Sequence, residues 1–229
     1  MSIWFVTPAW GRFELSAVCF EQRAQVIAEL AARGIEAQCV VVADDENLEL
    51  ARAHGFATVE RDNEWLGRRF NDGMQYAGEH DASWVVPIGS DSWIDIEYLL
   101  PLPSIRSART SRFYAVVKPD RIAQLVVERG GAGPYMLPAA ALARAHFRPA
   151  KDELHRGIDG STLAGLGRLR WQYRDLHPLQ YIGFRGNPHL TSYDRLWQYW
   201  GEREEGDPWT LLAERYDRVL VAAAQKALA

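Results

Sequence analysis

Acidic side chains follow two apolar runs of the sequence, at the points where buried strands are expected to end. Asp44 and Asp45 come directly after residues 39–43, and Asp91 follows residues 84–88. In an open α/β sheet, ligands bind outside the carboxyl ends of the strands. A carboxylate in that place can accept hydrogen bonds from a ribose or a base, or hold a hard cation that neutralises a diphosphate. These acids are therefore the first candidates for a binding site.

Each acid also has a purely structural interpretation. Asp44 or Asp45 could cap a helix that starts near Leu48, because short polar side chains commonly accept hydrogen bonds from the first amides of a helix. Asp91 could cap a turn before Ile94. However, a Gly-Ser-Asp-Ser run is an unusual exit from an apolar strand for packing alone, and this favours a ligand role at Asp91.

Arginine and asparagine side chains lie shortly before the Asp91 run. The spacing of apolar residues predicts a helix over residues 66–77, with Arg68, Arg69 and Asn71 away from its apolar face. Arginine offers a fork of N–H groups that matches phosphate oxygens, whereas a helical arginine taken alone is more often solvated. Their grouping favours a phosphate or sugar contact, and Arg12, in the first loop, has the same two interpretations.

The elements that must position these residues alternate between strand and helix over the first hundred residues. Strands are expected at residues 3–6, 39–43, 56–59 and 84–88, and helices at 14–33, 48–54 and 66–77. This alternation predicts a parallel sheet wound right-handedly. Gly67 and Gly73 each cost about 1 kcal/mol relative to alanine inside a helix, so they predict a close approach of backbone to the third helix.

After Tyr98 the pattern becomes antiparallel. A hairpin is expected around Pro119-Asp120, and Pro138 is expected to open a helix. The remaining strands are predicted at 113–118, 122–128, 171–176 and 181–184, and the helices at 138–146, 159–166 and 208–228.

Composition is that of an ordinary globular protein. The chain has 229 residues, of which 48% are hydrophobic, and a formal charge of −4. That charge gives no global attraction to nucleic acid or anionic lipid. Cys19 and Cys39 lie in apolar stretches and are expected to be buried, reduced thiols. No stretch has the length and apolar character of a membrane span and no secretion signal is found, so a cytoplasmic protein without a membrane partner is expected.

Several common catalytic motifs are absent from the sequence. It lacks the dinucleotide motif GxGxxG, the phosphate loop GxxxxGK[ST], the metalloprotease motif HExxH and the nucleophile elbow GxSxG. Their absence argues against the enzyme classes that depend on them.

Three motifs occur in one order over residues 3 to about 98. They follow Val6-Thr7-Pro8, and they are Val42-Ala43-Asp44-Asp45, Asn63 with Leu66-Gly67-Arg68-Arg69-Phe70-Asn71-Asp72-Gly73, and Ile88-Gly89-Ser90-Asp91-Ser92-Trp93-Ile94-Asp95. This series resembles the sugar-donor half of GT-A glycosyltransferases of the family-two type. The resemblance implies an α/β GT-A fold, with a mostly parallel, Rossmann-like sheet flanked by helices, a smaller antiparallel acceptor-side portion and a C-terminal helix. It also implies one continuous domain, with a donor half at 1–100 and an acceptor half at 101–229.

The resemblance assigns roles to residues of the donor half. Thr7, Pro8 and Arg12 would line the nucleotide base, and Asp44 or Asp45 would hold the base or ribose. The residues that would face the rest of the donor are Arg68, Arg69, Asn71 and Ser90, and Asp91 would bind a divalent metal, Mn²⁺ or Mg²⁺, on the diphosphate. The sequence departs from the family at Gly89, which replaces the first acid of the Asp-x-Asp motif. The metal would then be held more loosely or would not be needed.

By the same resemblance, Asp159 in the acceptor half would be the base that deprotonates the acceptor hydroxyl. A helix N-cap is an equally good interpretation of this residue. His177 resembles a late histidine that serves some GT-A enzymes as a metal ligand, although His-Pro turns are common and His189 is a competitor.

The first hypothesis is therefore a glycosyltransferase that moves a sugar from a UDP- or GDP-sugar to a hydroxyl, and inversion at the anomeric carbon is expected. The acceptor could be a carbohydrate, a protein or a hydroxymethylated DNA base. One alternative is a non-catalytic nucleotide- or carbohydrate-binding module that lost half of its metal motif at Gly89. Another is a nucleotidyltransferase acting on a sugar phosphate, which would release pyrophosphate.

Overall fold

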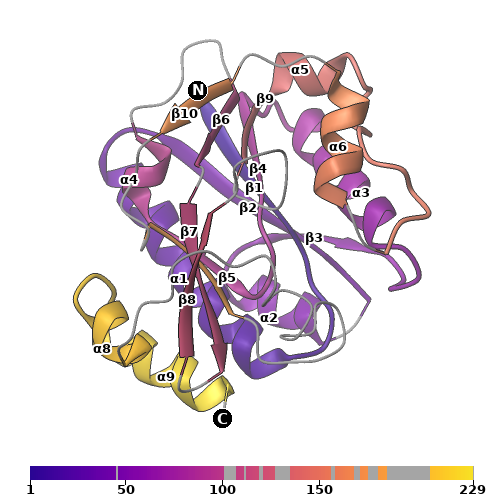
Figure 1. The fold of residues 1–229 in the computed structure, drawn as a ribbon. Coiled ribbons are helices and arrows are strands. Elements are labelled where there is room, and N and C mark those ends of the chain that lie inside the picture. The colour runs from indigo at the N-terminus through magenta and orange to yellow at the C-terminus, as the bar shows by residue number, and fades with distance from the viewer. Residues whose placement is uncertain are drawn as a thin grey trace.

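A seven-stranded, mostly parallel sheet forms the centre of the molecule (Figure 1). This is a computed structural model, and it describes residues 1–44, 46–100, 107–110, 112–118, 121–126, 135–155, 158–167, 171–174, 180–184 and 207–228. The strand order is β10-β6-β9-β4-β1-β2-β3. The bounds are β1 Ser2–Pro8, β2 Glu36–Ala43, β3 Ala57–Glu60, β4 Trp84–Pro87, β6 Ser107–Thr110, β9 Tyr135–Pro138 and β10 Trp171–Arg174.

Strands β1 to β4 are parallel, as the alternation of elements predicts. Phe5 of β1 lies opposite Cys39 of β2 on one side and Val86 of β4 on the other. β9 then pairs antiparallel with β4 and with β6, so the second half of the chain extends the sheet of the first half. The sequence pattern did not predict β6 or β9.

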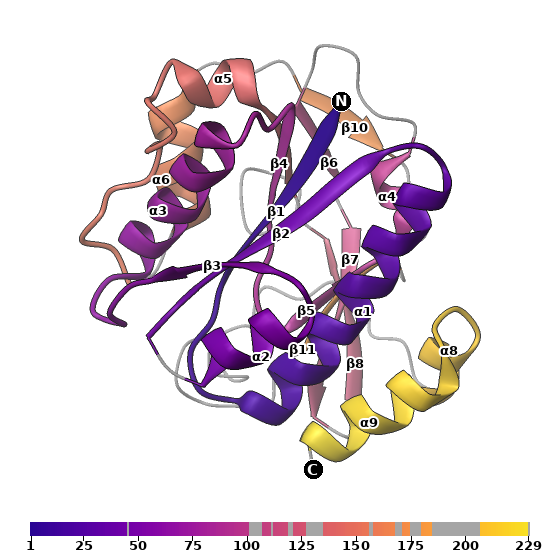
Figure 2. The same ribbon diagram turned by 180° about the vertical axis from the view of Figure 1, so that it is seen from behind.

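Helices cover both faces of this sheet (Figure 2). On one face lie α1 Phe13–Ala32, α2 Asn47–Ala53 and α4 Ile96–Leu99. On the other lie α3 Leu66–Glu79, α5 Ala139–Ala143 and α6 Ile158–Leu166. Each strand serves both faces because its side chains alternate. Ile3 and Phe5 join the core under α1, whereas Trp4 and Val6 join the core under α3.

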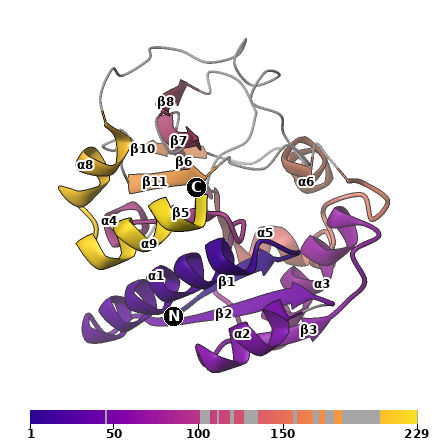
Figure 3. The same ribbon diagram turned by 90° about the horizontal axis from the view of Figure 1, so that it is seen from below.

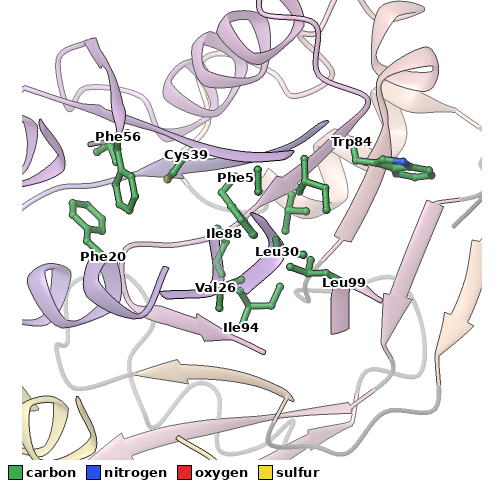
Figure 4. Close-up of a cluster of buried hydrophobic side chains, with 14 of the residues drawn as sticks. Phe5, Phe20, Val26, Leu30, Cys39, Phe56, Trp84, Ile88, Ile94 and Leu99 are labelled. Atoms are coloured by element: carbon green, nitrogen blue, oxygen red, sulfur yellow. The ribbon is translucent and has the colours of Figure 1, made fainter. Parts of the chain in front are cut away.

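The core under α1 is the larger of these two (Figure 4). Phe5 and Cys39 from the sheet meet Phe20, Val26 and Leu30 from the helix, and all five are buried. Burial of such side chains contributes about 1.5–3 kcal/mol each relative to exposure, so this interface fixes α1 on the sheet.

A second, four-stranded sheet with the order β5-β11-β7-β8 lies against the opposite side of α1 (Figure 3). Its strands are β5 Ser92–Ile94, β7 Arg112–Lys118, β8 Arg121–Val126 and β11 Tyr181–Phe184. Leu15, Val18 and Cys19 of α1 form a buried cluster with Trp93 of β5 and with residues of α8 Pro208–Ala213 and α9 Arg218–Leu228. The first helix is therefore apolar on two sides.

The end of the chain differs from the single helix predicted over residues 208–228. It forms two helices, because the chain turns between them and Asp217 accepts hydrogen bonds from the amides of Val219 at 2.8 Å and Leu220 at 3.1 Å. Arg215, in the turn, forms ion pairs with Asp95 and Glu97, the former at 2.6 Å. These pairs fasten the C-terminal helices to the segment that follows β5.

The helix predicted over residues 138–146 is also shorter. Pro138 is the last residue of β9, and α5 ends at Ala143. His146 and Phe147 then have left-handed backbone, with φ of 51° and 57°, which a continuing α-helix does not accommodate. Across the described residues, no helix combines the length and apolar character needed to cross a bilayer.

The close backbone approach predicted from Gly67 and Gly73 is confirmed. The amide of Gly67 donates to the carbonyl of Leu154 at 2.8 Å, and a Cβ at this position would overlap the carbonyl oxygen of Lys151. A Cβ at Gly73 would meet a Val6 methyl group at 2.5 Å. Helix α3 thus uses these glycines to contact β1 on one side and residues 151–154 on the other.

We expect Gly67→Ala to lower the free energy of unfolding by about 2 kcal/mol, because the added methyl group displaces the main chain of Lys151. Gly160→Ala in α6 is the matched control, since nothing lies within 4 Å of a Cβ there. Its stability should be unchanged or higher by up to about 1 kcal/mol, through helix propensity. Equal denaturant midpoints for the two variants would contradict the close approach.

Candidate functional site

The loop between β1 and α1, residues 9–12, is held from several elements at the carboxyl edge of the sheet. The amide of Ala9 donates to the carbonyl of Val42 at 3.0 Å, and Arg69 of α3 donates to the carbonyl of Ala9 at 2.8 Å. The side-chain amide of Asn47, at the start of α2, donates to the carbonyl of Gly11 at 3.3 Å. The loop is therefore built as a fixed platform.

This loop lies where the strand order reverses. The chain passes from β1 to β2 and β3 on one side, and β4 then pairs with the other side of β1. The amide of Ile88, just after β4, donates to the carbonyl of Val6 at 3.0 Å. In open α/β sheets the crevice at such a switch point is where ligands bind.

An ion pair joins the two loops at the switch point. Nη1 of Arg12 lies 3.2 Å from Oδ2 of Asp91, and the two side chains are 25% and 15% exposed. Oδ1 of Asp91 accepts a hydrogen bond from the hydroxyl of Ser92 at 3.2 Å. The Asp91 main chain is fixed as well, because its carbonyl accepts from the amide of Phe184 at 2.8 Å.

Arg12 takes an unusual backbone conformation for its type. Its φ is 47° and its ψ is 45°, which is left-handed and follows another positive φ, 54°, at Gly11. A side chain with a Cβ loses roughly 1–2 kcal/mol in this region relative to glycine. As the residue before α1, Arg12 makes no side-chain capping bond. Its side chain serves the pair with Asp91 instead.

Helix α1 holds the Asp91 segment from inside through two polar side chains. Arg23 is 2% exposed and donates to the carbonyl of Ser92 at 3.0 Å and to the hydroxyl of Thr7 at 3.4 Å. Gln22 donates to the carbonyl of Ile94 at 2.7 Å and accepts from its amide at 3.4 Å. Burial lowers the pKa of the Arg23 guanidinium from its ordinary value. The guanidinium still stays charged at neutral pH, because arginine is effectively always protonated in proteins.

Both cysteines are buried free thiols, as the sequence predicts. Burial raises the pKa of Cys39 to about 11 and also raises the pKa of Cys19. Neither thiol ionises at neutral pH, so nucleophilic chemistry by a thiolate is not supported at these positions.

The polar residues of helix α3 contact the loop after β1 and residues 150–152. Arg69 is buried and reaches Ala9, as described above. Asn71 is fully buried, and its amide donates to the carbonyl of Ala150 and to Oδ1 of Asp152, each at 2.7 Å, and accepts from the amide of Ala150 at 3.1 Å. Arg68 is half-buried, and its amide donates to the carbonyl of Asp152 at 3.1 Å. The described contacts of Asn71 therefore hold residues 150–152 on α3.

The other candidates of the donor half lie along the same edge. Asp44 is exposed after β2, and Oδ2 of its carboxylate accepts from the amide of Asn63, after β3, at 3.0 Å. Thr7 and Pro8 are buried at the end of β1, with the Thr7 hydroxyl engaged by Arg23. Ser90 is buried beside Asp91.

Three candidates are described partly or not at all. Asp159 lies in α6, as predicted, and only its main chain is described. Asp45 and His177 lie outside the described residues.

The side chains described around Asp91 do not form the metal site that the resemblance implies. Within the part of the chain that the structure describes, no three Asp, Glu, His or Cys side chains gather closely enough to share a metal ion. A Cβ at Gly89 would lie 2.5 Å from Oδ1 of Asp91, so a side chain there would require the Asp91 carboxylate to shift. The Asp91 carboxylate is also paired with the guanidinium of Arg12. A hard cation needs several oxygen ligands, and this set does not fit one.

Comparison with solved structures identifies the fold. The chain superposes with a TM-score of 0.58 on residues 1–349 of TarS from S. aureus in complex with UDP, at 13% identity over 100% of this chain and 70% of that one. It superposes at 0.52 on a mutant of Drosophila beta-1,4-galactosyltransferase 7 in complex with manganese, UDP-Gal and xylobiose, at 10% identity over 94% and 81% of the two chains. The chain has the GT-A fold. No family model and no curated protein matches this GT-A chain.

Sequence reasoning missed three residues that the fold brings to the site. Trp10 is 46% exposed in the loop after β1 and lies two residues before Arg12 in the sequence. Asn47 and Arg23 hold the loops, as described above. A signal for Arg23 was present, because it falls at the spacing of Cys19 and Leu30 in the apolar stripe of the first helix. A cation in such a stripe indicates a buried polar contact.

An ionic cluster ties α3 to the segment after α5. Arg148 pairs with Asp72 at 2.8 Å and with Asp152 at 2.9 Å, and Arg61 also reaches Asp72, at 2.5 Å. Burial opposes ionisation of Asp152, but hydrogen bonds from Asn71 and Arg148 outweigh it and hold the pKa of Asp152 below its ordinary value.

A carboxyl group with a lowered folded-state pKa stabilises the fold above its unfolded pKa and loses this contribution as pH falls. We therefore expect wild type to exceed Asp152→Asn in free energy of unfolding by a constant amount above roughly pH 5, and by a shrinking amount below roughly pH 4. Urea unfolding across this range measures the difference. Glu153→Gln, at an exposed neighbour, is the control and should have the stability of wild type at neutral pH. A constant difference at every pH for Asp152→Asn would refute the assignment.

Proposed function

We propose that this protein is a glycosyltransferase that moves a sugar from a UDP- or GDP-sugar to a hydroxyl group. The observation that carries the proposal is the Arg12–Asp91 ion pair, which joins two loops at the switch point of a GT-A sheet. The complexes of the two fold neighbours support the same class of ligand, since one holds UDP and the other UDP-Gal with xylobiose.

The nucleoside would lie over the loop after β1. Trp10 offers an exposed aromatic surface there, and the exposed carboxylate of Asp44 can accept hydrogen bonds from a ribose or base. Arg69 and Asn47 hold this loop through the carbonyls of Ala9 and Gly11. In this proposal they act as positioning residues for the nucleoside.

The reaction would be a single displacement. The oxygen of the acceptor hydroxyl forms a bond to the anomeric carbon of the sugar while the bond from that carbon to the diphosphate oxygen breaks. The nucleoside diphosphate leaves with the bonding electron pair, and the hydroxyl proton passes to the base, which we propose is Asp159 in α6. Attack opposite the leaving group inverts the anomeric carbon. The acceptor would be a carbohydrate, a protein or a hydroxymethylated DNA base, and each can be supplied in an assay.

The test is release of nucleoside diphosphate from UDP-glucose, UDP-galactose, UDP-N-acetylglucosamine and GDP-mannose, with and without these acceptors. We expect turnover with one donor, and we expect Asp91→Asn or Asp159→Asn to lower kcat by about 100-fold or more. The matched control is Asp81→Asn, because Asp81 is exposed and precedes β4 at the opposite edge of the sheet. Its kcat should equal that of wild type.

Other products would identify the alternatives. Release of pyrophosphate from a nucleoside triphosphate and a sugar phosphate would replace the proposal with nucleotidyl transfer. Tight binding of a nucleotide sugar without turnover would indicate a binding module. If no nucleotide sugar binds at millimolar concentration, the proposal is refuted.

A further inference from the structure

The carboxylate at the switch point already has a cationic partner. We infer that Arg12, fixed by Asp91, supplies the positive charge that meets the diphosphate of the sugar donor, in place of a divalent metal. This inference rests on the proposed function and assigns the way in which its leaving group is stabilised.

The geometry of the pair leaves the guanidinium able to bind a second anion. A guanidinium carries five N–H groups in a planar fork, and the distance of 3.2 Å to Asp91 involves Nη1. The Arg12 side chain is 25% exposed, so it is held in place and still reaches solvent. Arginine binds phosphate oxygens with paired, charge-assisted hydrogen bonds, and a fixed side chain loses less conformational entropy when it does so.

Two other arginines near this edge bind protein groups. Arg69 is 5% exposed and donates to the carbonyl of Ala9. Arg23 is 2% exposed and donates to Ser92 and Thr7. These two cations support the loops from inside, whereas Arg12 lies on the loop itself.

Gly89 is consistent with this arrangement. An acidic side chain at this position would have its Cβ 2.5 Å from Oδ1 of Asp91, so the end of the Asp91 side chain would have to shift from the position in which it pairs with Arg12. Glycine, at the position where the Asp-x-Asp motif would place its first metal ligand, requires no such shift.

The backbone of Arg12 is in a conformation that favours glycine. Its φ is 47°, in the left-handed region. Asp81, His146 and Phe147 also have positive φ, so this conformation alone assigns no role to a side chain. The Arg12 side chain makes no capping bond to α1, and its described contact is the pair with Asp91.

The experiment separates diphosphate binding from nucleoside binding. Dissociation constants for uridine, UDP, guanosine and GDP are measured by calorimetry in EDTA and again with Mn²⁺. For the matching nucleoside we expect the diphosphate to bind wild type about 30-fold more tightly than the nucleoside in EDTA, through charge-assisted hydrogen bonds. Mn²⁺ should change this ratio by less than about 3-fold, since Arg12 supplies the charge.

Arg12→Gly is the informative variant, because it removes the guanidinium and relieves the positive φ at once. Its melting temperature should stay close to that of wild type, because relief of the positive φ offsets loss of the ion pair with Asp91, while the preference for the diphosphate falls to about 3-fold or less and nucleoside affinity is kept. Arg12→Lys should retain an intermediate preference. Arg52→Ala, at an exposed position of α2, is the control and should match wild type.

Two results would overturn the inference. An increase of more than about 10-fold in diphosphate affinity with Mn²⁺, in wild type, would assign the charge to a metal and leave the proposed function intact. An unchanged diphosphate preference in Arg12→Gly would show that Arg12 does not bind the diphosphate, and it would also leave the proposed function intact. If none of the four compounds binds, the proposed function fails, and the inference fails with it.

Discussion

The structure depends on one helix that is buried from two directions. Helix α1 packs through Phe20, Val26 and Leu30 on the large sheet, and through Leu15 and Cys19 on the cluster formed with the small sheet and the C-terminal helices. Between these apolar contacts, Gln22 and Arg23 bind the main chain of β5. The strand that follows Asp91 is thereby fixed to the helix that follows Arg12. The ion pair between these two residues forms because their supports are joined.

Much of the donor half could be predicted from sequence because its signals are local. Apolar runs gave β1 to β4, helical spacing gave α1 and α3, and the glycines of α3 indicated a close contact that is present. The missed elements depend on distant partners. β5 has only three residues and is stabilised by β11, Gln22 and Arg23, and β9 is short and pairs with strands far along the chain. No local periodicity can report such pairings.

The candidate site shows the same division. The sequence predicted that Asp91 follows an apolar strand. It did not predict the ion pair with Arg12, because the two residues are 79 positions apart. Asn71 illustrates the opposite case. An amide on a polar helix flank suggested contact with a sugar donor, yet its described hydrogen bonds go to residues 150–152, because Gly67, one helical turn earlier, lets that segment approach. Sequence reports which groups are available, and the tertiary contacts decide which remain accessible.

The position of the last helices bears on how the chain is made. Tyr216 packs against Trp93 of β5, with ring centroids 4.9 Å apart, and Arg215 pairs with Asp95. These partners are synthesised more than one hundred residues after the strand they cover. During translation, the emerging chain would therefore display the indole of Trp93 and the outer side of α1 until residues 208–228 leave the ribosome. Chaperone engagement would then fall in that interval, and a nascent chain stalled before residue 208 would keep this apolar surface open.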